Sequence, residues 1–454
     1  MNNKNTLSLL FMSCMLFTAT IITAQPKKDF RNWASTPPMG WNSWDCYGST
    51  VTEDEVKANA DYMASKLKSS GWEYIVVDIR WFVENDKAGG YNEKNPIYVM
   101  DEYGRYMPAL NRFPSAKDGK GFKELADYVH SKGLKFGIHI MRGIPKLAVD
   151  KKLPIKGTNG ITADQIYSTE LQCQWLHDNY TIVATKPGAQ EYYNSIIEMY
   201  ASWGVDFIKV DDLSRPYHQG EIELIRNAID KTGRPIVFST SPGETPVESA
   251  AHVRTHANMW RMVDDVWDTW PHITHLFDIA QKWYPYIAAG TWPDCDMIPL
   301  GRISLRGERG ADRMTRLTHD EQYTLMNLFT IFRSPLIFGG DLPSNDAFTL
   351  SLLTNKEVLK MHRESTGVRQ VYQKDKHVAI TSRNAKTGDV YVALFNLTDD
   401  KTPAKVSVKL ADLGIKGKCT ITNMWTGKKL GQFSKEFSGS LVGHASGLYK
   451  LQKK

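Results

Sequence analysis

Residues 205–212 are Val205-Asp206-Phe207-Ile208-Lys209-Val210-Asp211-Asp212, an apolar run that ends in two carboxylates. Its β-branched centre is typical of a buried strand in a parallel sheet. Burying an unpaired charge is costly, so a core strand gains nothing from an acid at its end. We therefore interpret this run as a parallel strand and Asp211 as a functional residue.

Acids also follow other apolar runs of the chain. Carboxylates close the segments 74–78, 260–265 and 292–296, as they close 205–212. The carboxyl ends of parallel strands lie at one edge of a sheet, where the active sites of such folds are found. The pattern therefore predicts one polar pocket assembled from several strand ends.

Strand-like and helix-like segments alternate along most of the chain. Apolar runs predict strands near residues 39–46, 74–81, 135–142, 206–212, 235–241, 257–264, 287–292 and 334–339. Between them, apolar residues recur at helical spacing in 53–70, 122–132, 189–203, 221–230, 272–283 and 320–332. Eight alternations predict an α/β fold, a (β/α)8 TIM barrel with its active site at the C-terminal ends of the strands.

The pattern changes after about residue 365. Short strand-like runs at 378–381, 390–395 and 406–410 are separated by polar turns, and no convincing helix follows. Such spacing is typical of a small antiparallel β-sandwich. We therefore divide the chain into a leader at 1–24, a catalytic barrel at 25–364 and a β-sandwich at 365–454.

The first 24 residues have the features of a secretory signal peptide. A short basic start precedes the apolar run 7–17, and Thr23-Ala24-Gln25 offers a small-residue cleavage point. The apolar run is shorter than the about 20 residues that a membrane-spanning helix needs. We therefore expect an exported protein, periplasmic or extracellular, without a membrane span.

The composition argues against several kinds of partner. The net charge of +6 comes from interspersed acids and bases without an arginine-rich run, so we expect no nucleic-acid partner. The chain has no CxxC motif, and we expect neither a metal nor a cofactor. After the leader, the cysteines either form disulfides or stay as free buried thiols: Cys46, Cys173, Cys295 and Cys419. The sequence does not define the oligomeric state.

The segment 143–188 is a long connection between a predicted strand and a predicted helix. It contains prolines and glycines, followed by Trp175 and Tyr180. Long loops on barrels often carry function, and these aromatic rings are able to stack on a ligand. The alternative interpretation is a disordered insertion.

Paired carboxylates suit the cleavage of a glycosidic bond, in which one is ionised and the other supplies a proton. Asp211 is our candidate for the ionised partner. Lys209 precedes it on the same side of the strand, and a nearby ammonium favours a carboxylate. Asp265, at the end of another strand, is our candidate acid, and Asp264 is the competing choice. His139 either faces this pocket or is a satisfied core histidine.

One motif stands near the start of the mature chain, Thr36-Pro37-Pro38-Met39-Gly40-Trp41-Asn42-Ser43-Trp44. It resembles the opening signature of glycoside hydrolase family 27, the group of α-galactosidases and α-N-acetylgalactosaminidases. The similarity continues into the predicted sandwich through the segments 74–81, 128–138, 203–211, 261–265, 294–297 and 334–342. The resemblance therefore covers most of the mature chain.

The resemblance implies a retaining α-glycosidase that works by double displacement. Asp211 matches the family nucleophile and Asp265 the acid/base, which implies carboxyl groups roughly 5–5.5 Å apart. The positions that match the lining of the sugar pocket are Trp44, Asp78, Lys209, Arg261 and Asp296. Asp294 competes with Asp296 for its role.

Because of three departures from the family pattern, the resemblance does not define which sugar the enzyme prefers. The family usually has two adjacent acids at the second strand tip, whereas Ile79 follows Asp78 here. The fifth strand of the family usually ends near a Cys-Glu-Trp run, whereas this chain has the small Ser241 there. Ser241 either opens space near the 2-position of the substrate or leaves its recognition to another group. Cys173 matches a family cysteine, but its partner position is Leu213, which implies that the usual disulfide is absent.

The resemblance thus implies, first, an α-galactosidase that acts on terminal α-galactosides of an oligosaccharide or polysaccharide. The departures keep open a β-L-arabinopyranosidase, an α-N-acetylgalactosaminidase or an enzyme acting on α-1,6 glucans. A non-catalytic sugar-binding protein on the same fold is the third alternative. The presence of both candidate carboxylates argues against it.

Overall fold

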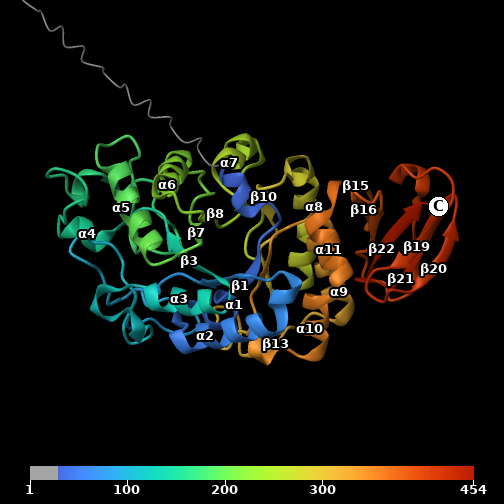
Figure 1. The fold of residues 1–454 in the computed structure, drawn as a ribbon, viewed down its shortest axis with the longest axis horizontal. Coiled ribbons are helices and arrows are strands. Elements are labelled where there is room, and N and C mark those ends of the chain that lie inside the picture. Colours follow the sequence, from blue (N-terminus) through green and yellow to red (C-terminus); the bar gives the residue numbers. More distant parts are fainter. Residues whose placement is uncertain (1–28, 454) are drawn as a thin grey trace, which may run out of the picture.

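Parallel strands form the wall of a closed barrel in the computed structural model, which describes residues 29–453 (Figure 1). The nine-stranded sheet has the spatial order β10 (Trp292–Asp294), β9 (Met259–Arg261), β8 (Val237–Thr240), β7 (Phe207–Asp211), β3 (Lys135–Met141), β2 (Tyr74–Val77), β1 (Met39–Asn42), β14 (Leu336–Phe338) and β11 (Met297–Ile298). The two ends of this order, β10 and β11, are separated in the chain only by Cys295 and Asp296. This interrupted strand therefore closes the cylinder, and the predicted TIM barrel is confirmed.

The seventh barrel strand begins later than the sequence predicts. Residues 288–291 of the expected strand at 287–292 form a turn instead, in which Ala288 and Thr291 make an isolated antiparallel bridge. Gly290 has a φ of 84°, and a side chain there would collide with the backbone of Arg31. The turn therefore delays β10 until Trp292. The other predicted strands overlap the observed ones.

Helices cover the outside of the barrel and alternate with its strands. Their bounds are α2 (Glu53–Tyr62), α3 (Lys123–Ser131), α5 (Ala189–Ser202), α6 (Gln219–Thr232), α7 (Ala250–His256), α8 (Trp270–Trp283), α9 (His319–Phe332), α10 (Ala347–Thr354) and α11 (Lys356–Glu364). Capping boxes start α2, at Thr52, and α9, at Thr318. The helix predicted at 53–70 is α-helical only to Tyr62, after which a π-helical turn follows.

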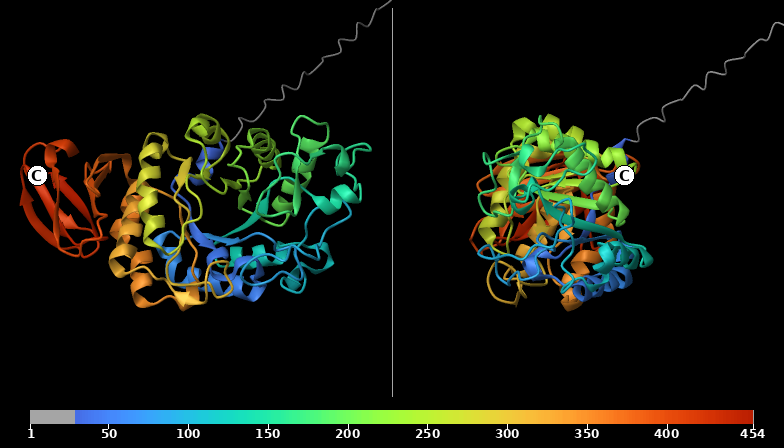
Figure 2. Two further views of the ribbon diagram at one scale, coloured as in Figure 1. Left: turned by 180° about the vertical axis from the view of Figure 1, so that it is seen from behind. Right: turned by 90° about the vertical axis from the view of Figure 1, so that its left-hand side faces the viewer.

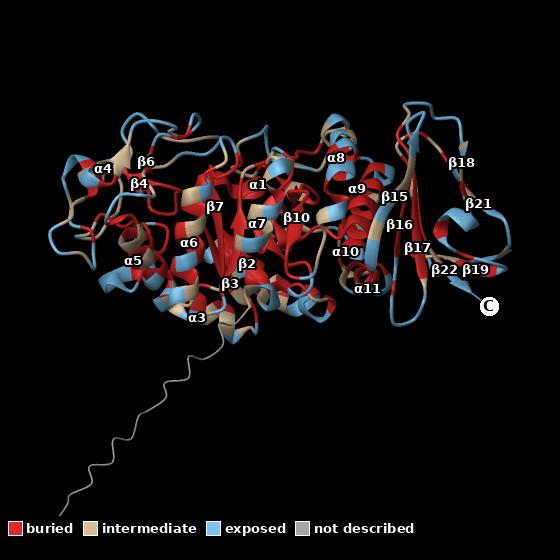
Figure 3. Ribbon diagram, turned by 90° about the horizontal axis from the view of Figure 1, so that it is seen from above, coloured by how far each residue is buried: buried red, intermediate tan, exposed pale blue. Residues whose placement is uncertain are grey.

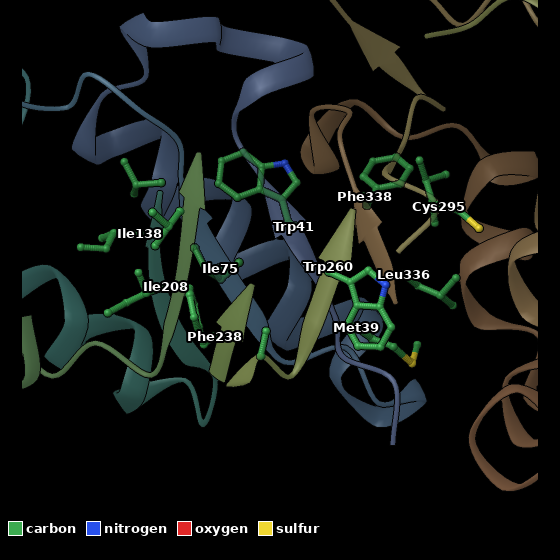
Figure 4. Packing of buried hydrophobic residues seen from close by; sticks show 14 of the residues in the cluster. Met39, Trp41, Ile75, Ile138, Ile208, Phe238, Trp260, Cys295, Leu336 and Phe338 are labelled. Carbon is green, nitrogen blue, oxygen red and sulfur yellow. The ribbon is translucent and has the colours of Figure 1, made fainter. Parts of the chain in front are cut away.

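Side-chain alternation along the strands separates two apolar layers. Ile208 and Val210 of β7 pack between the sheet and the helices, whereas Phe207 packs inside the barrel. Figure 4 shows members of the outer layer, among them Trp41, Ile75, Ile138, Phe238 and Trp260. Lys209 and Asp211 lie two and four residues after Phe207 on the same strand. Alternate residues of a strand share a face, so their side chains also point to the barrel interior.

Two excursions from the barrel contain small sheets. The segment 143–188 includes α4 (Lys146–Asp150) and a sheet of β4 (Ile144–Pro145), β6 (Asn179–Ile182) and β5 (Tyr167–Ser168). The alternative of a disordered insertion is therefore wrong for this segment. The second excursion follows β11 as the pair β12 (Arg302–Ile303) and β13 (Arg313–Met314).

Antiparallel strands from Thr366 onward form the predicted C-terminal β-sandwich, which is confirmed. The larger sheet has the order β15 (Thr366–Lys374), β16 (His377–Arg383), β17 (Val390–Asn396), β22 (Ser446–Lys453), β19 (Cys419–Asn423) and β20 (Lys429–Phe433). The smaller sheet pairs β18 (Ala404–Lys409) with β21 (Glu436–Leu441). Side chains from both sheets, such as Val392 and Phe437, form a separate core.

The sandwich packs against α8 and α9 at one end of the molecule (Figures 1 and 2). The Thr324 hydroxyl donates to the carbonyl of His444 at 2.7 Å, and the Asn327 amide donates to Ser446 at 2.8 Å. The Trp270 ring stacks on His444 with centroids 3.9 Å apart. Most residues of α9 are consequently buried, since the helix lies between barrel and sandwich (Figure 3).

Within residues 29–453, the four cysteines are free and buried, which is the second of the two alternatives left by the sequence. In the same part of the chain, no helix combines the length and apolar character needed to cross a membrane. The proposed leader at 1–24 lies outside the described residues and stays a prediction.

Candidate active site

A pocket of ≈ 340 Å³ opens at the C-terminal ends of the barrel strands. Most of the predicted site residues line it, namely Trp44, Asp78, Lys209, Asp211, Arg261 and Asp265. The remaining one, Asp296, lies below the pocket beside a small cavity of ≈ 10 Å³ in the barrel. The barrel therefore gathers side chains that are up to about 250 residues apart in the sequence.

Asp211 ends β7 and faces the pocket, with a side chain that is 10% exposed. Its Oδ1 atom accepts a hydrogen bond from the amide of Asp212 at 3.0 Å. Asp212 itself has a φ of 62°, in the left-handed region, and its carboxylate lies 2.7 Å from Arg142. The two adjacent acids thus have different surroundings, and only Asp211 of the two lines the pocket.

His139 lies between two carboxylates of the pocket. Its Nδ1 atom is 2.7 Å from Asp78 Oδ2, and its Nε2 atom is 3.2 Å from Asp211 Oδ2. Burial lowers the pKa of His139, but the charges of Asp78 and Asp211 raise it above its ordinary value. Burial also raises the pKa of Asp78, yet the charges of His139 and Lys209 lower it on balance. Of the two alternatives that the sequence left for His139, a pocket residue or a core histidine, the structure therefore supports the pocket residue.

The basic group beside Asp211 is not the one that the sequence predicts. The ion-pair partner of Lys209 is Asp78, at 3.9 Å, and the imidazole of His139 is the basic group beside Asp211. Residues two apart on a strand share a face but lie roughly 7 Å apart. His139, on the neighbouring β3, is directly opposite Lys209 and reaches the strand end more closely. Lys209 still lines the pocket.

Arg261, at the end of β9, contacts two carboxylates. Its guanidinium donates to Asp265 Oδ1 at 3.1 Å, and its Nη1 atom lies 2.7 Å from Asp296 Oδ1. Burial raises the pKa of Asp265, but the charge and hydrogen bond of Arg261 lower it on balance. Burial raises the pKa of Asp296 to about 7 in spite of the same guanidinium. In the free protein, Arg261 therefore favours an ionised Asp265.

Asp264 and Asp265 both line the pocket but have different partners. Asp264 pairs with Arg215 at 2.8 Å, and the two side chains are 54% and 53% exposed. Asp265 is 45% exposed and is held by Arg261, which is buried. A buried partner fixes a carboxylate better than a mobile surface arginine does. The geometry therefore favours Asp265 over Asp264 as the oriented acid.

Asp296 holds the loop that follows Asp265. Its Oδ2 atom accepts a hydrogen bond from the amide of Val266 at 2.7 Å. Asp294, the competing choice, accepts from the amide of Asp296 at 3.0 Å, and burial raises its pKa to about 6. Of these two acids, Asp296 is the one that contacts Arg261. It is thus placed to position Arg261 and the loop rather than to touch a sugar directly.

An aromatic wall, formed by Trp44, Tyr91 and Trp175, leads from the pocket to the surface. Trp44 starts the short helix α1 (Trp44–Tyr47), and the Tyr91 ring stacks on it with centroids 5.7 Å apart. Trp175 lies 6.3 Å beyond Tyr91 and is 37% exposed. The sequence pointed to Trp175 through its long connection but missed Tyr91, because the loop after β2 has no periodic pattern. Other missed lining residues are Arg215, Pro242, Met297, Glu308 and Arg309.

Family models match the two domains separately. A model described as alpha galactosidase A matches residues 36–149 and 145–364. A second model, the alpha galactosidase C-terminal beta sandwich domain, matches residues 375–451. The chain belongs to glycoside hydrolase family 27. It is therefore a glycoside hydrolase by family membership.

Relatives of several specificities are found within the family. A solved structure of a family-27 β-L-arabinopyranosidase from Geobacillus stearothermophilus is 52% identical, with a TM-score of 0.91, and the match covers 93% of this chain and 98% of that one. A putative α-N-acetylgalactosaminidase from Bacillus halodurans is 46% identical, with a TM-score of 0.83 and coverage of 92% and 98%. Alpha-galactosidase 2 of Arabidopsis thaliana is 26% identical, covering 96% of each chain.

Two of this family-27 member's three departures lie in the pocket wall. Ile79, directly after Asp78, and Ser241 both line the pocket and are almost fully buried. The third concerns Cys173, which is a free buried thiol, as the leucine at its expected partner position implies. Burial raises the pKa of this thiol to about 12. The departures therefore alter the substrate-facing wall and leave the carboxylates in place.

Proposed function

We propose that this family-27 member is a retaining exo-glycosidase that prefers terminal β-L-arabinopyranosides. L-Arabinopyranose has the ring hydroxyls of galactose in the same relative configuration but lacks the exocyclic hydroxymethyl group. The observation that carries the proposal is Ile79, buried in the pocket wall directly after Asp78. An apolar side chain there offers no partner to an additional hydroxyl, and a buried unpaired hydroxyl is unfavourable.

The 52% identity to a β-L-arabinopyranosidase supports the same choice. An α-galactosidase, the first expectation from the sequence, is the second candidate, because the family models and many relatives carry that name. The two sugars differ by a single hydroxymethyl group, so one pocket is able to accept both in the same orientation. The selectivity between the two sugars then depends on whether the wall at Ile79 offers a hydrogen-bond partner to the hydroxymethyl group.

The proposed mechanism is a double displacement with two aspartates. Asp211 attacks the anomeric carbon, and Asp265 gives a proton to the leaving oxygen. Asp265 then takes a proton from a water molecule that attacks the anomeric carbon, which breaks the bond to Asp211 and releases the sugar with its original anomeric configuration. The Asp212 amide and His139 fix the orientation of the nucleophile. The separation of roughly 5–5.5 Å between the two carboxyl groups stays a prediction.

Asp265 needs a proton in the first step, although Arg261 favours its ionised form in the free protein. Its side chain is 45% exposed, so a bound sugar would displace much of the water around it. Loss of water raises the pKa of a carboxyl group, because the charged form is no longer solvated. We therefore propose that substrate binding raises the pKa of Asp265, which then takes up a proton from the solvent and serves as the acid.

The aromatic wall supports a substrate that extends outward from the pocket. Sugar rings stack their C–H faces on aromatic side chains. Trp44 lies at the pocket, and the partly exposed Trp175 lies toward solvent. We propose that the terminal sugar binds against Trp44 while the leaving group lies along Tyr91 and Trp175.

A panel of nitrophenyl glycosides tests the choice of sugar. The panel contains the β-L-arabinopyranoside, the α-D-galactoside and the α-N-acetylgalactosaminide. We expect the highest kcat/KM with the arabinopyranoside. A galactoside that reacts at least ten times faster would establish the second candidate instead. A best reaction with the N-acetylated sugar would point to the space beside Ser241.

Proton NMR of the first product formed tests retention, since an inverted anomer would exclude the double displacement.

We also propose that the enzyme is exported, on the basis of residues 1–24. Expression of the full chain in a bacterial host, followed by mass spectrometry of the periplasmic protein, tests this proposal. The expected mass corresponds to a chain that starts near Gln25. An unprocessed chain confined to the cytoplasm would contradict it.

A further inference from the structure

Two helices on the outside of the barrel bring together one carboxylate and two imidazoles. Glu223 lies on α6, and His252 and His256 lie on α7. One potential ligand atom from each side chain lies within 4.8 Å of the others. All three residues are partly buried, and none lines the sugar pocket. The cluster is therefore separate from the proposed catalytic site.

The two histidines are placed as a chelating pair. They are four residues apart on one helix, which puts their side chains on the same face. Their rings stack with centroids 4.1 Å apart and an interplanar angle of 22°. Glu223 approaches from the neighbouring helix, with Oε1 3.1 Å from His252 Nε2. A single ion at this point would contact both helices.

Hydrogen bonds already engage Nδ1 of each ring, so that Nε2 is the nitrogen left to bind an ion. His256 Nδ1 lies 2.9 Å from the carbonyl of His252, so this nitrogen carries the proton and Nε2 keeps its lone pair. His252 Nδ1 lies 2.6 Å from the hydroxyl of Tyr217, which leaves Nε2 directed at Glu223. Histidines that bind metals commonly use the second nitrogen in this way, because the hydrogen bond fixes the ring.

We propose that Glu223, His252 and His256 bind a divalent first-row transition ion, with Zn²⁺ as the best match. Two imidazole nitrogens and one carboxylate oxygen suit zinc, and water completes the tetrahedron. Calcium and magnesium prefer sites made largely of oxygen ligands. Ligand atoms around tetrahedral zinc lie roughly 3.3 Å apart, so small rotations of these surface side chains would close the site.

The ion would have a structural effect beyond the two helices. Tyr217, which bonds His252, belongs to the loop between β7 and α6. Arg215, in the same loop, pairs with Asp264 at the rim of the pocket. Binding at the cluster would therefore join α6 and α7 and also restrain this loop through the Tyr217 hydroxyl. The ion itself would contact no substrate.

Calorimetry of the metal-stripped mature protein, without a histidine tag, tests the site with Zn²⁺. We expect one bound ion per chain and a higher Tm in its presence, because a ligand that binds only the folded state stabilises it. Titration with Co²⁺ should give visible absorption bands of the strength typical of tetrahedral coordination. Wild-type protein that binds no Zn²⁺, or gives only the weak bands of hydrated Co²⁺, overturns the proposal.

Variants assign the ligands. We expect His256→Ala and Glu223→Gln to weaken Zn²⁺ binding by at least about tenfold, and Tyr217→Phe to weaken it by a smaller factor. The matched control is His275→Ala, which removes a histidine paired with Glu244 at 3.0 Å outside the cluster. Its affinity should equal that of the wild type. Binding that survives His256→Ala and Glu223→Gln, or that is lost with His275→Ala, would place the ion elsewhere. Circular dichroism checks folding, and if a ligand variant unfolds, Tyr217→Phe and the Co²⁺ spectrum of the wild type decide.

Discussion

The guanidinium of Arg261 donates a hydrogen bond of 3.1 Å to Asp265 while its other terminal nitrogen lies 2.7 Å from Asp296. One buried cation thus orients the proposed acid and is itself held by an acid from the next strand. Burial raises the pKa of Asp296 to about 7, whereas Arg261 lowers that of Asp265 on balance. This arrangement distinguishes Asp265 from its neighbour Asp264, which pairs with an exposed arginine.

Asp265→Asn should therefore impair the enzyme far more than Asp264→Asn. Loss of a general acid lowers kcat/KM by at least about 100-fold for a substrate with a poor leaving group. Loss of the exposed Asp264–Arg215 pair should lower kcat/KM by less than about tenfold. Azide, which needs no general base, should restore turnover of an activated substrate to Asp265→Asn. Equal losses in the two variants would contradict the assignment of the acid.

Asp211→Asn should remove almost all turnover, because an amide does not attack the anomeric carbon. The expected loss in kcat is at least about 10⁴-fold with every substrate of the panel. The substitution is isosteric, and its Tm should stay close to that of the wild type. Steady-state kinetics of purified protein measure the loss, and a variant with near-wild-type kcat would show that the nucleophile lies elsewhere.

Ile79→Asp should shift the preference toward galactosides, because a carboxylate beside Asp78 can accept a bond from the additional hydroxyl. A hydrogen bond to a charged group is worth about 1.5–3 kcal/mol, so the kcat/KM ratio of galactoside to arabinopyranoside should rise at least about tenfold. Ile79→Val, which keeps the wall apolar, is the matched control and should leave the ratio nearly unchanged. An unchanged kcat/KM ratio in Ile79→Asp would show that residue 79 does not determine which sugar the enzyme prefers.

Trp175→Ala should raise KM for oligosaccharides but not for substrates without an extended leaving group. Aromatic stacking of about 0.5–1.5 kcal/mol corresponds to a rise of roughly two- to tenfold. The matched control substrate is the glycosyl fluoride, whose leaving group is too small to reach Trp175. Equal changes in KM for both substrates would mean that Trp175 acts on the terminal sugar or on the fold.

Asp294→Asn should flatten the dependence of stability on pH. Burial raises the pKa of Asp294 from 3.8 to about 6, so the folded protein holds this proton more tightly than the unfolded chain. Its contribution to the free energy of unfolding therefore falls as pH rises from about 4 through about 6, by roughly 3 kcal/mol. Thermal unfolding between pH 4 and pH 8 measures the effect. Parallel Tm curves for variant and wild type would show that Asp294 does not titrate in this range.

Much of the barrel follows from local patterns. The strand 207–211 could be recognised because its apolar residues are β-branched and its acids come only at the end. The start of the strand predicted at 287–292 was wrong, because the turn at Gly290 is set by the approach of Arg31, a residue far away in the sequence. Tyr91 was missed for a related reason, since only the folded loop brings its ring onto Trp44.

The contacts of the acids in the pocket could not be predicted from local patterns either. Side-chain alternation along β7 placed Lys209 and Asp211 on the inner face, but it could not reveal that the imidazole of His139 lies beside Asp211. Nor could it separate Asp264 from Asp265, whose partners come from different parts of the structure. Each distinction depends on a side chain from another strand or loop.

Local sequence patterns were enough to predict the alternation of strands and helices, the carboxylates at the strand ends and the family resemblance. These features are encoded in short-range spacing, because backbone geometry repeats every few residues. Only the folded chain shows which groups lie together: His139 with Asp211, Arg261 with both Asp265 and Asp296, and Glu223 with the two histidines of α7. Contacts of this kind depend on the packing of distant segments, and no local rule specifies them.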